Sequence, residues 1–282
     1  MQERFLPGAV EKLTPRSITP MEQRLRAGCV PTSISMVFSG FGINISEQAL
    51  VEKYFPTVKL PITDPKVGVS NIDTVRGIIQ IIKDLGLGES LQLDVFIPGL
   101  SEYTRKSSEK EYIVKAKPQA VGSYGKGFEK GSDERAFFET LEQLAKVGEI
   151  GVYTANAKLM QFAKNHTFWR EPAEATEGFY RELSSFISKG HIVGPHGGMT
   201  RHTRTLDGSK MVRLPNREDE KGYLILDPIG RTYPVSLQSL VMIDSFGVRG
   251  DVFDYLFRVS PREETLKSQK PGLRRFIPNF RG

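Results

Sequence analysis

The chain has 282 residues, of which 39% are hydrophobic and 26% charged, a balance that is typical of a folded protein and excludes wholesale disorder. Its single cysteine excludes an intramolecular disulfide framework and any multi-cysteine zinc or iron–sulfur site. No apolar run is long enough to cross a bilayer, and the first residues contain no secretory signal pattern. We therefore expect a cytoplasmic protein, or one that is secreted without a cleavable signal.

The formal net charge of +6 is concentrated in residues 261–282, which we interpret as a basic C-terminal tail. Such a tail can attract an acidic partner, an anionic membrane or nucleic acid. No pattern of interleaved aromatic and basic side chains accompanies the charge, so nucleic-acid binding is not favoured. A solvated tail that improves solubility is the simplest interpretation, with an acidic partner as the alternative.

Hydrophobic spacing predicts a series of helices in the first half of the chain. Apolar side chains recur at helical intervals over 28–39, a second helix begins after the N-cap candidate Ser46, and a third covers about 71–85. The stretch 91–97 alternates apolar and polar residues and is expected to be a strand. Further helices are expected at about 132–147, 156–165 and 175–189, with a short strand at 150–155.

The last third of the chain favours strands that are mostly separated by Gly-rich or charged turns. Helices followed by antiparallel strands indicate an α+β fold. We predict one domain over residues 1–260, with an insertion at about 98–175. Residues 98–131 lack periodicity and are expected to form an exposed loop that includes a short strand at 112–114. The strands expected in the last third are 191–195, 199–206, 210–214 and 222–228.

The only cysteine, Cys29, stands where the first helical pattern begins, directly after Gly28. A thiol is a strong nucleophile only as the thiolate, and the free N–H groups and dipole of a helix N-terminus favour negative charge. The alternative is a structural cysteine, because free cysteines are often buried. The position of Cys29 alone supports the two interpretations equally.

The residues around Cys29 favour the reactive interpretation. Gln23 lies six residues before it, and the run GCVPTSISMVFSGFG is followed by ISEQAL. This arrangement resembles papain-like cysteine peptidases, and among them the bacteriocin-leader (double-glycine) peptidases and their freestanding bacterial relatives. Val30 departs from the family, which usually has glycine there. The resemblance implies a papain-like fold, with an N-terminal catalytic helix packed on a C-terminal antiparallel sheet, and implies that the Gln23 amide donates to an oxyanion hole.

A general base must come from one of four histidines, two of which are interpreted as structural. His166 ends a helical segment beside aromatic residues, and His191 opens a strand that is expected to be buried. His196 precedes a Gly-Gly turn and stays open as an alternative base. His202 has the stronger case because it begins a strand.

The case for His202 depends on its expected strand partner. If 202–206 and 223–227 pair antiparallel with Leu206 opposite Tyr223, His202 stands opposite Asp227, within reach of an Nδ1–H to carboxylate hydrogen bond. The family resemblance agrees, because a histidine there begins one strand and the aspartate of an Asp-Pro pair ends the next. The rival arrangement is a tight turn at Asp207-Gly208, which would separate the two strands.

These residues together predict a cysteine peptidase that acts on a peptide or isopeptide bond through a thioester. Cys29 would be the nucleophile, His202 the acid–base group, Asp227 its orienting partner and Gln23 an oxyanion donor. The expected partner is a protein or peptide substrate, and no metal or organic cofactor is required. The alternatives are an acyltransferase or transglutaminase-like enzyme on the same scaffold, and a catalytically inactive relative that binds a peptide or partner.

Overall fold

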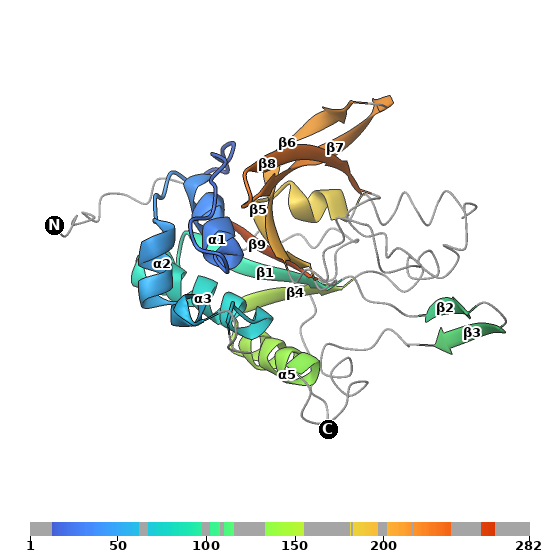
Figure 1. The fold of residues 1–282 in the computed structure, drawn as a ribbon, viewed down its shortest axis with the longest axis horizontal. Helices are drawn as coiled ribbons and strands as arrows, with labels where there is room; N and C mark the ends of the chain where they lie inside the picture. Colours follow the sequence, from blue (N-terminus) through green and yellow to red (C-terminus); the bar gives the residue numbers. More distant parts are fainter. Residues whose placement is uncertain are drawn as a thin grey trace.

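A computed structural model of the chain describes residues 13–61, 67–97, 102–107, 110–115, 133–154, 181, 183–196, 202–215, 217–237 and 255–262. Within these residues the main feature is a mixed seven-stranded sheet in the order β4-β1-β9-β5-β6-β7-β8 (Figure 1). A separate hairpin joins β2 (Glu102–Ser107) to β3 (Lys110–Lys115). The strands of the main sheet are β1 (Leu91–Ile97), β4 (Ile150–Thr154), β5 (His191–His196), β6 (His202–Leu214), β7 (Arg217–Asp227), β8 (Arg231–Ser236) and β9 (Leu256–Pro261).

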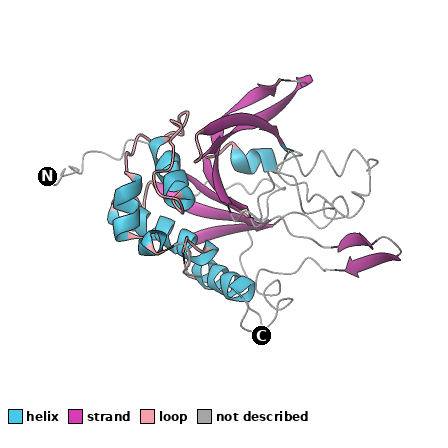
Figure 2. Ribbon diagram, viewed as in Figure 1, coloured by secondary structure: helices cyan, strands magenta, loops and turns pink. Residues whose placement is uncertain are grey.

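Four α-helices lie on one side of the sheet, and a short helical segment at 183–187 lies on the other (Figures 1 and 2). Apolar side chains fill both interfaces, since alternate residues of a strand point to opposite faces. In β5, for example, Val193 packs in the cluster under the helices and Ile192 in the cluster under Phe186. The helices are α1 (Cys29–Ser39), α2 (Glu47–Lys53), α3 (Asn71–Asp84) and α5 (Asp133–Lys146), with a 3-10 turn, η1, at Pro56–Lys59.

The helices predicted at 28–39, after Ser46, at 71–85 and at 132–147 are confirmed by α1, α2, α3 and α5. Local signals account for this agreement: the Ser46 side chain accepts a hydrogen bond from Ala49 N, and Ser70 caps α3 in the same way. The helix expected at 156–165 and the end of the tail after Arg262 lie outside the described residues. Of the helix expected at 175–189, only residue 181 and residues 183–187 are described as helical.

The sheet is mixed, whereas the sequence predicted an antiparallel sheet from the last third of the chain. β1 and β4 pair in parallel at the end of the sheet, and α5 connects them because parallel neighbours require a crossover. β1 also pairs with β9, the last described strand, although the two strands lie far apart in the sequence. The mixed arrangement remains compatible with an α+β class in its coarse sense.

β6 runs without a break from His202 to Leu214 and so replaces the two strands predicted at 199–206 and 210–214. The rival turn at Asp207-Gly208 does not form; three extra residues of β6 are accommodated there as a bulge before pairing with β7 resumes. The absence of a side chain at Gly208 lets β6 pass close to residues 187–190, because a Cβ atom there would collide with the carbonyl groups of Ile187 and Gly190. β6 and β7 are consequently direct neighbours.

Candidate active site

Cys29 is the first residue of α1, and Gly28 is the N-cap. The first N–H groups of a helix have no acceptor within it, so they can stabilise a negative charge at this end. The Cys29 side chain is half-buried, whereas the residues that follow, from Val30 to Phe38, are buried. The thiol therefore lies where the helix emerges from the core, and it keeps access to solvent.

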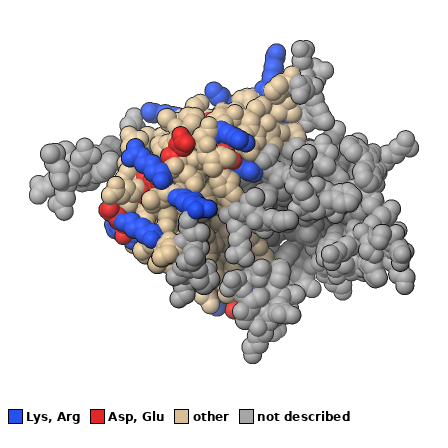
Figure 3. Space-filling model, viewed as in Figure 1, with Lys and Arg blue, Asp and Glu red and all other residues tan. Residues whose placement is uncertain are grey.

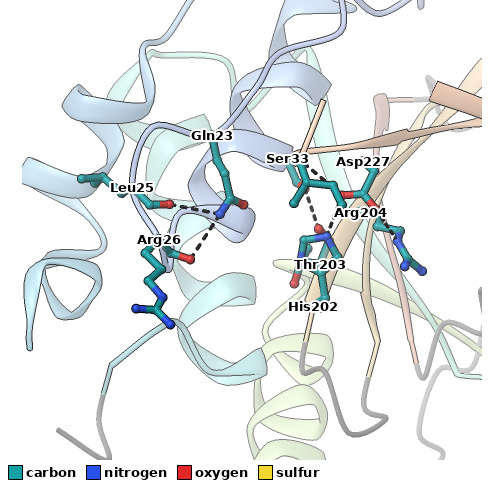
Figure 4. A network of polar contacts seen from close by, with 9 residues as sticks. Gln23, Leu25, Arg26, Ser33, His202, Thr203, Arg204 and Asp227 are labelled. Carbon is teal, nitrogen blue, oxygen red and sulfur yellow. Dashed lines mark hydrogen bonds and ion pairs between the residues drawn. The ribbon is translucent and has the colours of Figure 1, made fainter. Parts of the chain in front are cut away.

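Two hydrogen bonds fix the first turns of α1 against the start of β6 (Figure 4). The Ser33 hydroxyl donates to the carbonyl oxygen of Thr203 at 3.4 Å, and the Thr205 hydroxyl donates to the carbonyl oxygen of Ser33 at 3.2 Å. Ser33 lies one helical turn after Cys29. These contacts place the thiol beside His202, the first residue of β6.

His202 and Asp227 contact each other directly, with 2.7 Å between Nε2 and Oδ1. The predicted pairing of β6 with β7 is confirmed, but Leu206 stands opposite Ile225 and not Tyr223, so Arg204 and not His202 lies opposite Asp227. A shift of two residues keeps every side chain on its face, which is why the contact survives. The predicted Nδ1 contact is wrong, because Nε2 binds the carboxylate.

Asp227 is held by three donors and is almost fully buried, with 3% of its side chain exposed. Oδ1 also accepts a hydrogen bond from the backbone N–H of Ile229 at 3.1 Å, and Oδ2 accepts one from Nε of Arg204 at 2.9 Å. Burial raises the pKa of this carboxyl group, but His202, the Ile229 N–H and Arg204 outweigh it and lower the pKa to about 2. Asp227 is therefore a fixed anion at neutral pH.

The electrostatics of Cys29 and His202 are linked. Burial raises the pKa of the thiol, but the hydrogen bond with His202, the backbone N–H of Thr203 and the charge of the imidazole outweigh it, and the net effect is a lowered pKa. The hydrogen bond with Asp227, followed by that with Cys29, raises the pKa of His202 to about 9. This arrangement favours a thiolate beside an imidazolium near neutral pH, a pair that can attack a carbonyl carbon and then supply a proton.

Gln23 lies on the loop before α1, and its backbone N–H donates to the carbonyl oxygen of Pro228, next to Asp227. Its amide nitrogen donates to the carbonyl oxygens of Leu25 and Arg26, at 3.1 and 3.2 Å, on the side away from His202 (Figure 4). Gln23 Oε1 is buried and has no hydrogen-bond partner among the described residues. The amide must turn before it can donate to an oxyanion, so that role stays a prediction.

Glu47 fixes the same loop from α2 and was missed by the sequence analysis. Its carboxylate accepts hydrogen bonds from the backbone N–H groups of Arg24, at 2.9 Å, and Leu25, at 3.4 Å. The sequence offered no signal for this role, because Glu47 also fits the first turn of α2 as an ordinary acidic residue. The loop that leads into Cys29 thus depends on a contact between residues 23 positions apart.

Gly28 makes room for that carboxylate, since a Cβ atom would collide with Glu47 Oε1 and approach the carbonyl oxygen of Leu25 at 2.9 Å. We expect Gly28→Ala to lower the free energy of unfolding by about 1–3 kcal/mol and to slow alkylation of Cys29, because the loop must shift. Gly88→Ala is the control, because its Cβ would meet nothing within 4 Å. Urea unfolding and thiol alkylation measure both effects, and equal stability of the two variants would contradict this account of the loop.

The other three histidines are not part of the contacts between Cys29, His202 and Asp227 that the structure describes. His191 is fully buried, with Nδ1 3.5 Å from Asp207 Oδ1, and burial lowers its pKa. This fits the expected buried strand. His196 ends β5 directly opposite His202 in the strand register. His166 lies outside the described residues.

A metal site, a membrane-spanning helix or a charged binding surface would each require its own arrangement of side chains among the described residues. They contain no group of three or more His, Cys, Asp and Glu residues that could hold a metal ion. No helix in the described ranges is long and apolar enough to cross a membrane. On the face seen in Figure 3, the Lys and Arg side chains that are described are scattered, with Asp and Glu among them.

Comparisons of the chain with protein-family models, with curated proteins and with solved structures find no match. Any function assigned to the site therefore rests on its geometry and its chemistry.

Proposed function

We propose that the protein is a cysteine hydrolase with a papain-like arrangement, which cleaves a peptide or isopeptide bond in a protein or peptide substrate. The observation that carries the proposal is the meeting of three groups from distant parts of the chain. The Cys29 thiol at a helix N-terminus contacts His202, and His202 Nε2 lies 2.7 Å from a buried carboxylate, Asp227. A nucleophile, a base and an orienting acid in this order are the requirements of nucleophilic acyl transfer.

In the first half of the reaction, the Cys29 thiolate attacks the substrate carbonyl carbon and forms a C–S bond. The carbonyl oxygen becomes an oxyanion, which the backbone N–H groups at the start of α1 stabilise. The C–N bond then breaks as His202 gives its proton to the leaving amine. The products of this step are a free amine, a thioester on Cys29 and a neutral imidazole on His202.

In the second half, neutral His202 takes a proton from water, and the resulting hydroxide equivalent attacks the thioester carbonyl. The C–S bond breaks, and the carboxylic acid product leaves. The proton on His202 and the negative charge on Cys29 restore the starting ion pair. Asp227 stays ionised throughout and keeps the imidazole oriented, because its three donors hold it.

We favour an active enzyme over an inactive peptide-binding relative because a specific partner, His202, lowers the pKa of the Cys29 thiol. A cysteine with a purely structural role requires neither an imidazole beside its thiol nor a buried carboxylate beside that imidazole. Here His202 and the backbone N–H of Thr203 stabilise the Cys29 thiolate at the N-terminus of α1. Asp227 in turn stabilises the positive charge of the His202 imidazolium. Perturbed groups of this kind gather at functional sites.

The test is covalent capture by a peptide carrying an electrophilic vinyl sulfone or acyloxymethyl ketone group. We expect wild-type protein to gain the mass of one probe, located on Cys29 by peptide mapping, and Cys29→Ala to gain none. The probe must react faster than a small alkylating agent of equal intrinsic reactivity, because binding in the site aligns the electrophile with the thiolate. Equal rates for both reagents would contradict a peptide-directed enzyme and favour a merely accessible thiol.

A further inference from the structure

Arg204 contacts the site through Asp227 but takes part in no proton transfer or bond change of the proposed reaction. It lies two positions after His202 on β6 and, by the strand register, directly opposite Asp227 on β7. Its Nε donates to Asp227 Oδ2 at 2.9 Å, while His202 uses Oδ1. The two cations therefore contact different oxygen atoms of one buried carboxylate.

We propose that Arg204 is a positioning residue of this site, which holds the Asp227 carboxylate in place and shares its negative charge, so that His202 retains a proton that it can still release to a leaving group. This inference rests on the proposed function. The first part of it follows from the hydrogen bonds, since each carboxylate oxygen has its own donor and the group cannot rotate without breaking one. The second part follows from the sum of the charges.

Four charges meet here: the Cys29 thiolate, the His202 imidazolium, the Asp227 carboxylate and the Arg204 guanidinium. Their sum is zero when all are ionised. If Arg204 is neutralised, the group becomes net negative, and the proton on His202 is held more tightly. A more tightly held proton is transferred less readily to the leaving amine, because a general acid works best with a pKa near the working pH.

The burial of the carboxylate makes this effect large enough to measure. Asp227 has 3% and Arg204 18% of the side chain exposed, so water screens their interaction only in part. The pKa of His202 already reaches about 9 with Arg204 in place. Without the guanidinium, the imidazolium would be a weaker acid still, and its proton transfer to the leaving amine near neutral pH would be slower.

The groups that face His202 come from several elements and must be considered together. Cys29 approaches from α1 and Asp227 from β7, and Arg204 lies on β6 itself. His196 of β5 stands opposite His202 in the strand register. Arg231 of β8 stands opposite Asp227 on the other side, and it is exposed.

Arg231 offers a matched control, because Asp227 lies between Arg204 and Arg231 in neighbouring strands. Both arginines are directly opposite the carboxylate in the ladder, yet the hydrogen bond to Asp227 comes from Arg204. Neutralising Arg231 removes the same charge from an exposed position. Any difference between the two variants therefore measures the contact with the carboxylate and not the general loss of a positive charge.

The experiment follows the imidazole of His202 by NMR titration in full-length protein with labelled histidine, assigned with His202→Gln. All variants carry His196→Gln, so that a second imidazole in register with His202 cannot contribute. We expect Arg204→Met to raise the pKa of His202 by about one unit and Arg204→Lys to leave it within about half a unit. Arg231→Met should leave it unchanged. Where Arg204→Met does not fold, as judged by circular dichroism, Arg204→Gln serves as the neutral variant.

An unchanged or lowered pKa of His202 in the neutral variant would overturn the inference, because Arg204 would then serve stability alone. An equal rise in Arg231→Met would overturn it too, since contact with the carboxylate would be irrelevant. The titration also separates this inference from the proposed function. Failure of the peptide probe to label Cys29, together with the expected shift in the neutral variant, would reject the hydrolase and retain the charge-sharing role of Arg204.

Discussion

Replacement of His202 by alanine is expected to slow alkylation of Cys29 by iodoacetamide at pH 6 by at least about tenfold, the change in thiolate fraction that one pKa unit produces. The substitution removes the hydrogen bond and the positive charge that lower the pKa of the thiol, and burial, which raises it, stays. The backbone N–H groups of Thr203 and Val30 alone then stabilise the thiolate. Alkylation rates measured between pH 4 and 10 give the pKa of the thiol in each variant.

His196→Ala is the matched control for this experiment, since it removes an imidazole from the neighbouring strand position, opposite His202. We expect it to leave the alkylation profile unchanged. If His196→Ala slows the reaction and His202→Ala does not, the base lies on β5 and the assignment of His202 is wrong. If neither substitution has an effect, Cys29 is a structural thiol, and the proposed hydrolase fails with it.

Replacement of Asp227 by asparagine is expected to remove a pH dependence of stability between about pH 6.5 and 9. The pKa of His202 is raised from 6.5 to about 9, chiefly by Asp227. A raised pKa adds stability that is fully present below the unfolded value and is lost as the pH rises through the folded value. A shift of this size corresponds to at most about 3 kcal/mol. Urea unfolding from pH 5.5 to 9.5 measures it.

The measurement should be made in a Cys29→Ala background, because the lowered pKa of the thiol has the opposite effect on the slope. In that background Asp227 still raises the pKa of His202, although the contribution of Cys29 is lost and the rise is smaller. We therefore expect the free energy of unfolding to fall as the pH rises, over a narrower range, and Asp227→Asn to abolish the fall. Asp227→Asn should also destabilise the protein at every pH in the range, since Arg204 loses its buried partner.

Asp84→Asn is the control for the loss of an anion. The pKa of Asp84 is also lowered to about 2, but there the main cause is a hydrogen bond with Lys53, a lysine on the protein surface. Lysine does not titrate between pH 6.5 and 9, so this variant should keep the slope of its parent. A slope that persists in Asp227→Asn would mean that another group binds the proton, and His202 would then not be the acid of the site.

Sequence alone located the elements that depend on neighbouring residues. Apolar spacing and the serine caps predicted α1, α2 and α3 within one or two residues, because helix periodicity and capping act over a few positions. The same local signals placed Cys29 at a helix N-terminus and His202 at the start of a strand. The face shared by His202 and Asp227 also followed from sequence, since it depends only on the alternation of a strand.

The tertiary structure decided which groups in the site touch one another. The strand register, the choice of Nε2 by Asp227 and the continuity of β6 through Gly208 depend on neighbouring strands and on the carbonyl groups that Gly208 approaches. Arg204, two residues after His202, was given no role from the sequence, yet it binds the carboxylate.

The loop before Cys29 depends on tertiary contacts in the same way. The contacts of Gln23 with Leu25, Arg26 and Pro228, and of Glu47 with the same loop, involve backbone groups whose positions the folded chain alone creates. Residue types and local periodicity thus determined which groups are available at the site. Their hydrogen-bond partners were decided by long-range packing, because a hydrogen bond requires a donor and an acceptor within about 3 Å, and no pattern along the chain sets that distance.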